Sequence, residues 1–169
     1  MTRSQHAVGV CRVDYANPAH ASALVALLDA YAKDPMGGGT GLCDYAKKNV
    51  VPGLAARAQA FSVLAFLGDA TQTPVGLINC LEGFSTFAAK PLVNVHDVIV
   101  LPDWRGQGVV RSMLELVEQI ARERGACKLT LEVLSGNQSA LRAYAKWGFE
   151  AYQLDPEAGS AQFLQKWLD

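Results

Sequence analysis

The stretch from residue 92 to residue 134 changes its hydrophobic pattern twice, and this change constrains the fold more than any other feature of the chain. Residues 92–100 are rich in valine and isoleucine, apolar residues recur at helical spacing from Gly108 to Gly125, and apolar and polar residues alternate over 128–134. The first and third patterns are typical of strands, and the second is typical of an amphipathic helix that a glycine ends. The sequence therefore predicts a strand, a helix and a second strand in this order.

The rest of the chain predicts further helices and strands around this unit. Expected strands, rich in β-branched or aromatic residues, cover 7–13, 61–67, 74–81, 150–154 and 161–167. Asn17 and Asn137 are expected to cap the N-termini of helices that continue to about residue 31 and residue 146. Residues 44–60 are expected to be helical with a kink or break at Pro52-Gly53, and the glycine-rich residues 33–41 to form a loop.

Length and charge limit the classes of protein that the chain can belong to. It has 169 residues, of which 50% are hydrophobic, and its formal net charge at pH 7 is −1. A chain of this size buries roughly 70% of the surface that its unfolded form exposes, so residues 1–169 are expected to fold as a single domain. Because the net charge is small, neither nucleic acid nor a membrane is expected as a partner.

The cysteines give no sign of a metal site or a disulfide framework. Cys11, Cys43, Cys80 and Cys127 are far apart, and none belongs to a Cys-x-x-Cys pair. The N-terminal residues lack the apolar core of a secretion signal, and no apolar stretch is long enough to span a bilayer. A reduced, cytoplasmic protein without a bound metal is expected from these features.

Two glycines at alternate positions, Gly106 and Gly108, lie between the strand that ends at Val100 and the helix that follows. Glycines let backbone N–H groups converge, and the first turn of a helix has N–H groups without partners in the helix. Such a place binds an anion, most naturally a phosphate or pyrophosphate. A glycine-rich turn before an ordinary helix is the alternative. The segment has no Gly-Lys-Ser/Thr and no third glycine, so it is neither a Walker loop nor a dinucleotide-binding fingerprint.

Several motifs follow one another in a fixed order over the second half of the chain. They are the strand 95–100, Arg105-Gly-Gln-Gly108, Glu132-Val133, and Asn137 followed by Ala140, Tyr144 and Gly148-Phe149. In order and spacing the chain resembles the GNAT superfamily of acyl-CoA-dependent N-acetyltransferases, most densely over 93–152, and is most similar in character to the diamine and polyamine acetyltransferases. The resemblance implies an α/β fold with a mixed, mostly antiparallel, splayed central sheet flanked by helices. Val110 departs from the family pattern, which has Gly or Ala there.

The resemblance implies acetyl-CoA as the acyl donor and no metal. Main-chain amides of the loop and helix start would hold its pyrophosphate, and the end of the preceding strand would pair with its pantetheine arm like an added strand. The amides belong to Arg105, Gly106, Gln107, Gly108, Val109 and Val110, and the strand residues are Val98, Ile99 and Val100. Asn137 and Tyr144 would also contact the cofactor, and Tyr144 would donate a proton to the leaving thiolate. Helix capping by Asn137 and core packing by Tyr144 are the structural alternatives.

Three residues are candidates for the base that removes a proton from the acceptor amine. His96 and Asp97 lie on the strand before the glycine loop and are expected to face opposite sides of the sheet, while Glu132 lies five residues before Asn137. We favour His96, because an unperturbed imidazole, with a pKa of about 6.5, suits a base at neutral pH. A hydrogen-bonded or solvated strand residue is the alternative for each of the three.

The acceptor is predicted to be a small-molecule primary amine that attacks the thioester directly. Residues 82–87 interleave aromatic and small polar side chains, and Tyr31, Asp34 and Asp44 flank the glycine-rich loop. Carboxylates and aromatic faces attract cations. Acetylation of a protein N-terminus or lysine, and a non-catalytic acyl-CoA-binding module, are the alternatives. The last strands of this family often pair across a dimer, so the resemblance allows a homodimer.

Overall fold

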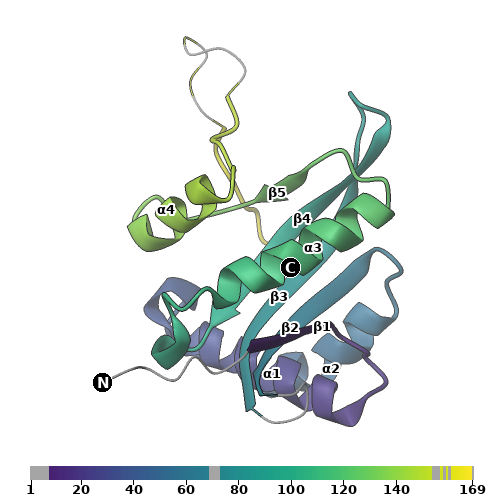
Figure 1. The fold of residues 1–169 in the computed structure, drawn as a ribbon, viewed down its shortest axis with the longest axis vertical. Coiled ribbons are helices and arrows are strands. Elements are labelled where there is room, and N and C mark those ends of the chain that lie inside the picture. The colour runs from purple at the N-terminus through teal and green to yellow at the C-terminus, as the bar shows by residue number, and fades with distance from the viewer. Residues whose placement is uncertain (1–7, 69–72, 154–156, 158, 160, 169) are drawn as a thin grey trace. The chain divides into compact units, whose positions relative to one another are not determined.

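The computed structural model describes residues 8–68, 73–153, 157, 159 and 161–168 (Figure 1). The chain forms two compact units, residues 1–131 and residues 132–169, and each is described by itself. The single domain expected over 1–169 stays a prediction.

A five-stranded sheet forms the centre of the first unit, with its strands in chain order (Figure 1). The strands are β1 (Val8–Arg12), β2 (Ala60–Leu67), β3 (Thr73–Ser85), β4 (Lys90–Val100) and β5 (Leu129–Leu131). Neighbouring strands are antiparallel except β4 and β5, which are parallel. The predicted α/β fold with a mostly antiparallel sheet is confirmed.

The helices begin where local side-chain chemistry predicts. The first unit contains α1 (Pro18–Lys33), α2 (Asp44–Ala55), α3 (Val109–Glu123) and two short 3-10 turns, Pro35–Gly37 and Pro102–Trp104, and the second contains α4 (Gln138–Lys146). The side chain of Asn17 accepts hydrogen bonds from the first turn of α1, and that of Asn137 accepts one from Ala140 in α4. The helix expected over 44–60 is shorter, because α2 ends at Ala55, and a division into two short helices at Pro52-Gly53 is wrong, because α2 continues through both residues. Pro52 lies in the last turn, so the proline removes one hydrogen bond close to the end of the helix.

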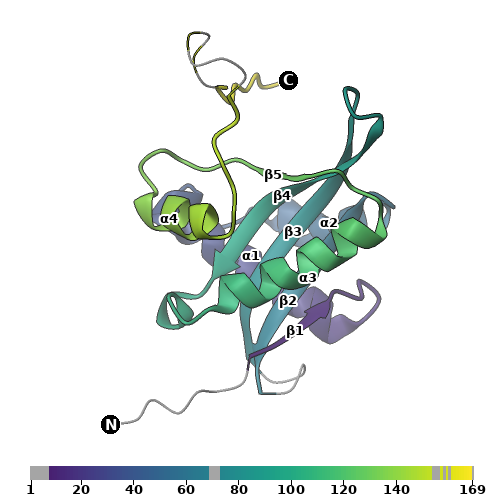
Figure 2. The same ribbon diagram turned by 45° about the horizontal axis from the view of Figure 1, so that its top comes forward.

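The helices of the first unit cover both faces of its sheet, with α3 on one face and α1 and α2 on the other (Figure 2). The apolar stripe of α3 is buried and comprises Val109, Met113, Leu114, Val117, Ile120 and Ala121. Gly76 of β3 lets this helix approach closely, since a Cβ there would lie 2.9 Å from Met113 Cε and 3.1 Å from Val109 Cγ1. On the opposite face Leu24 and Leu27 of α1 pack in one cluster with Leu77 and Ile99 of β3 and β4.

The two strands expected at the C-terminal end are absent from the described residues there. Residues 150–153 and 161–168 form no strand, and residue 154 lies outside the described residues. One backbone hydrogen bond, from Ala161 N–H to Tyr152 O at 3.5 Å, joins the two segments. A strand needs a ladder of such bonds, so the alternating pattern of these residues is not sufficient for a strand.

Candidate active site

The glycine loop forms an open start to α3. Gly106 and Gly108 have φ values of +73° and +84°, and a Cβ at either position would have no heavy atom within 4 Å. The first bond of the helix runs from Ser112 N–H to Gly108 O, and no side chain caps it. The N–H groups of the first turn are therefore not used within the helix. An anion fits this space, since it would meet several N–H groups and the positive end of the helix dipole.

Other residues of the loop are engaged in the protein's own contacts. The N–H of Arg105 donates to Pro102 O at 3.2 Å, so in this structure it is not available to a pyrophosphate. The guanidinium of Arg105 donates to Val100 O at 3.0 Å and to the carboxylate of Asp34 at 2.7 Å. This hydrogen bond from Arg105, followed by one from the Met36 N–H, lowers the pKa of Asp34. Arg105 therefore ties the end of β4 to the loop that follows α1.

The end of β4 has a strand partner on one side. Val98, Ile99 and Val100 pair with β3, whereas β5 pairs with β4 only over residues 93–95. Within the described part of the first unit, no strand pairs with the other edge of residues 98–100. An extended, amide-bearing arm could therefore add to this edge of β4 like a further strand. At the start of α3, Val109 is buried in the core and Val110 is half-buried.

A cavity of about 530 Å³ lies among α1, α2 and strands β3 and β4. Its apolar lining includes Leu28, Ala32, Leu42, Val50, Leu54 and Leu81, and its polar lining comprises Tyr31, Arg57, Asn79, His96 and Asp97. Burial raises the pKa of Tyr31, and the negative charges of Asp97 and Asp34 raise it further. The lining is thus mostly apolar and includes the carboxylate of Asp97 and the guanidinium of Arg57.

His96 and Asp97 line this cavity together because the sheet is irregular between them. Asn79 pairs with Asp97 and Cys80 pairs with Val95, so His96 is an extra residue in β4. The expectation that the two side chains face opposite sides of the sheet assumed regular alternation, which a β-bulge removes. His96 is exposed, and Asp97 is half-buried with Oδ2 accepting a hydrogen bond from Asn79 Nδ2 at 3.0 Å.

The remaining predicted site residues are divided between the two units. Glu132, Asn137 and Tyr144 belong to the second unit, where Asn137 caps α4 and Tyr144 contacts Phe149 edge-on, so their roles in the site stay predictions. In the first unit, residues 82–87 are not among those that line the cavity. Glu82 forms an ion pair with Arg124 at 3.0 Å. Phe84 and Phe87 of the same segment are exposed, as is Asp44.

The sequence did not predict three polar residues that are connected to Asp97 by hydrogen bonds. Ser62 and Asn79 are buried and hydrogen-bonded to each other, and Tyr15 binds Ser62. The available signal was a polar residue inside an otherwise apolar strand, in Phe61-Ser-Val-Leu64 and Leu77-Ile-Asn-Cys80. Among the described residues, no group of three or more His, Cys, Asp or Glu could hold a metal ion, and no helix there has the length and hydropathy that crossing a bilayer requires.

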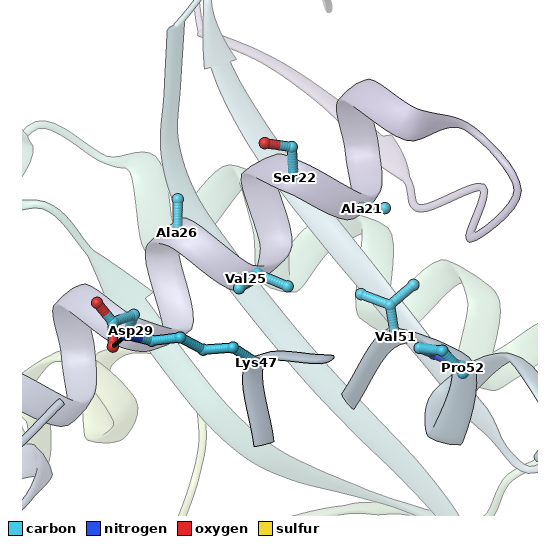
Figure 3. Close-up of a pocket in the computed structure, with 8 residues that line it drawn as sticks. All are labelled: Ala21, Ser22, Val25, Ala26, Asp29, Lys47, Val51 and Pro52. Carbon is cyan, nitrogen blue, oxygen red and sulfur yellow. Dashed lines mark ion pairs between the residues drawn. The ribbon is translucent and has the colours of Figure 1, made fainter. Parts of the chain in front are cut away.

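A second, shallower hollow of about 670 Å³ lies between α1 and α2 and is lined by Ala21, Ser22, Val25, Ala26, Asp29, Lys47, Val51 and Pro52 (Figure 3). Figure 3 shows Lys47 of α2 reaching toward Asp29 of α1, at 3.2 Å. Asp29 also binds Lys33 at 2.6 Å and accepts a hydrogen bond from the Leu42 N–H at 2.8 Å. Asp29 therefore links the two helices that border the candidate site.

We expect Asp29 to stabilise the fold above about pH 4 and to lose this effect in acid. The hydrogen bond from Lys33, then those from Leu42 and Lys47, lowers the pKa of Asp29 from 3.8 to about 2. A carboxyl group whose pKa falls on folding stabilises the folded state above its unfolded pKa, and the stabilisation disappears as the pH falls through the folded pKa. Urea unfolding should show Asp29→Asn less stable than the parent at about pH 5, with a much smaller difference near pH 2.

Glu115→Gln is the control for this experiment, because Glu115 forms an exposed ion pair with Arg111 on α3. Such pairs contribute little to stability, so this variant should match the parent at both pH values. A constant difference between Asp29→Asn and the parent from pH 5 to pH 2 would contradict the assignment.

A protein-family model matches the part of the chain that contains the cavity strands and the glycine loop. Residues 44–149 match the family model described as "Acetyltransferase (GNAT) family". This range includes the cavity strands, the glycine loop and α4. The chain belongs to the GNAT acetyltransferase family. The membership predicted from the motifs is thereby confirmed.

Two characterised relatives in this GNAT family match about half of the chain. A streptothricin acetyltransferase from Streptomyces lavendulae is 36% identical over 88 residues, which is 50% of this chain and 47% of the relative. A thialysine N-epsilon-acetyltransferase from Caenorhabditis elegans is 27% identical over 81 residues, which is 48% of each chain. The chain thus spans about half the length of these curated relatives.

A solved structure supports the fold over nearly the whole chain. AAC(6′)-Iy, in complex with the bisubstrate analog CoA-S-monomethyl-acetylneamine, aligns with a TM-score of 0.74 at 16% identity and covers 96% of this chain and 99% of its own. At this identity the likeness establishes the GNAT fold alone.

Proposed function

We propose that this protein is an acetyl-CoA-dependent N-acetyltransferase that moves an acetyl group to the primary amine of a small molecule. The observation that supports this proposal most is the position of the cavity. His96 and Asp97 line it, and the strand that holds them continues into residues 98–100, where no strand of the described first unit pairs with the second edge and Arg105 binds Val100 O. An acyl donor along that edge would bring its thioester to an amine in the cavity.

Each residue has a role in this proposal. The first-turn amides of α3 and the open space at Gly106 and Gly108 would hold the pyrophosphate of acetyl-CoA, whose thioester supplies the acetyl group. His96, exposed beside the cavity, would take a proton from the ammonium of the acceptor, with Asp97 and Glu132 as the other candidates. The amine nitrogen then forms the new bond to the carbonyl carbon, the C–S bond breaks, and the nitrogen loses its second proton to solvent. Tyr144 would protonate the thiolate that leaves.

The substrate class is inferred from the cavity and from the relatives. The cavity has a largely apolar lining that includes the carboxylate of Asp97, which suits an amine on a short hydrocarbon chain. The relatives are named for streptothricin and thialysine, and both names fit acetylation of small amines. A homodimer and a cytoplasmic location stay predictions.

Thermal stabilisation followed by a transfer assay tests the proposal. Acetyl-CoA and CoA should raise the melting temperature and ATP should not, because a ligand that binds only the folded state stabilises it, by about 2.7 kcal/mol at one hundred times its Kd. Thiol release from acetyl-CoA should then appear with 1,4-diaminobutane, spermidine, thialysine or streptothricin. Stabilisation without transfer to any of them would favour the non-catalytic module. No stabilisation at millimolar acetyl-CoA would contradict the proposal itself.

A further inference from the structure

Four polar side chains form a continuous row of hydrogen bonds across the sheet, from the segment after β1 to β4. Tyr15 Oη lies 2.9 Å from Ser62 Oγ, Ser62 Oγ donates to Asn79 Oδ1 at 2.6 Å, and Asn79 Nδ2 donates to Asp97 Oδ2 at 3.0 Å. Ser62 is 0% exposed and Asn79 is 4% exposed. These residues, called the polar row below, end at the cavity that Asp97 lines.

The chemistry of these groups sets the direction of every bond in the polar row. An ionised carboxylate only accepts hydrogen bonds, so Asn79 must present its NH₂ group to Asp97 and its oxygen to Ser62. Ser62 therefore donates to Asn79, and its oxygen accepts from the hydroxyl of Tyr15. Burial raises the pKa of Tyr15, which keeps this hydroxyl protonated. Every donated proton therefore points toward Asp97.

The polar row is not what the fold itself requires. On the same face of the sheet, the next residues along β2, β3 and β4 are Leu64, Leu77 and Ile99, which are buried in an apolar cluster. Buried polar groups must be desolvated, and replacing a hydrogen-bonded set by apolar side chains is often neutral for stability. The polar row is fully satisfied, since no buried side-chain nitrogen or oxygen of the described residues lacks a partner. Substitutions in the polar row should therefore affect the carboxylate of Asp97, where the row ends.

We propose that Tyr15, Ser62 and Asn79 are positioning residues that hold the carboxylate of Asp97 so that its second oxygen binds the ammonium group of the acceptor. This inference rests on the proposed function. The carboxylate of Asp97 lines the cavity together with leucines of α1, α2 and β3, which would contact the hydrocarbon chain. Arg57, which follows α2, also lines the cavity, and its guanidinium donates to Gly53 O of that helix.

Steady-state kinetics with 1,4-diaminobutane tests this role. Asp97→Asn should raise the KM for the diamine roughly tenfold to a hundredfold, because a charge-assisted hydrogen bond is lost. Ser62→Ala and Asn79→Leu leave the carboxylate in place but unsupported, and each should raise the same KM by about fivefold. The KM for acetyl-CoA should not change in any of them. Ser62→Thr keeps the hydroxyl and should restore the parent value.

Thr130→Val is the matched control. It removes a hydroxyl that binds Asn94 at 3.2 Å between β4 and β5 of the same sheet, and neither residue lines the cavity. A purely structural role of the polar row predicts a lower melting temperature in Ser62→Ala with an unchanged KM for the diamine, and that result would overturn the inference. If Ser62→Ala does not fold, Tyr15→Phe gives the same test at the half-buried far end of the polar row.

Direct titration with 1,4-diaminobutane separates failure of this inference from failure of the proposed function. Diamine binding that weakens in Ser62→Ala and Asp97→Asn, without any acetyl transfer, would contradict the proposed function and support the positioning role. Acetyl transfer with the same KM for the diamine in the parent, Ser62→Ala and Asn79→Leu would contradict the positioning role alone.

Discussion

Gly108→Ala is expected to weaken acetyl-CoA binding roughly tenfold to a hundredfold, as measured by calorimetry. Gly108 has a φ of +84° at the N-terminus of α3, and its missing side chain leaves the space in front of the first-turn N–H groups open. A methyl group there would enter the space that a pyrophosphate needs, and alanine also disfavours a positive φ by about 1–2 kcal/mol. The methyl group would block access to the N–H groups. A change of φ would turn these groups away from a bound anion.

Gly125→Ala is the matched control for this prediction. Gly125 follows the other end of α3, has a φ of +73°, and likewise has no heavy atom within 4 Å of an added Cβ. The two variants should therefore lose similar amounts of stability to urea, and only Gly108→Ala should lose affinity for acetyl-CoA. Equal affinities in the two variants would place the pyrophosphate away from the start of α3.

Tyr144→Phe is expected to lower kcat about a hundredfold and to leave the Kd for acetyl-CoA unchanged. The substitution removes one hydroxyl and keeps the ring, so the edge-on contact with Phe149, at 5.8 Å between ring centroids, should persist. Loss of a general acid typically costs a factor of 100 to 10,000 in rate. The effect should be smaller for a thioester with a more acidic leaving thiol, because a more stable thiolate depends less on protonation.

Tyr45→Phe is the control for the chemical step, since Tyr45 lies exposed on α2 and is not in the proposed site. It should retain the parent kcat. An unchanged kcat in Tyr144→Phe as well would leave Tyr144 as a packing residue and require another acid for the leaving thiolate.

The features that the sequence predicted correctly depend on neighbours in the chain. The boundaries of α3 follow from Gly108 and Gly125, and the starts of α1 and α4 follow from Asn17 and Asn137, because capping and positive φ are properties of a few adjacent residues. The order of strands and helices from residue 8 to residue 146 was predictable for the same reason. The GNAT motifs were recognisable because they consist of short runs at fixed spacing.

The features that the sequence predicted wrongly depend on pairing between distant segments. The pattern of residues 161–167 is that of a strand, but a strand forms only where a partner supplies a ladder of hydrogen bonds. His96 and Asp97 line the same cavity because β4 has a register shift against β3, and no local pattern in β4 reveals this shift. Their shared cavity also requires α1 and α2 to cover this part of the sheet.

The sequence by itself thus determined the family, the starts of α1 and α4, both ends of α3 and the glycine loop, since each is encoded in contiguous residues whose backbone preferences act locally. Only the tertiary structure decided which side chains meet at the site. Ser62 and Asn79 are ordinary polar residues in the sequence, and they become neighbours of Asp97 because three strands align in one register. Hydrogen bonds between side chains require distances near 3 Å, and such distances between residues far apart in the chain exist only after the sheet has formed.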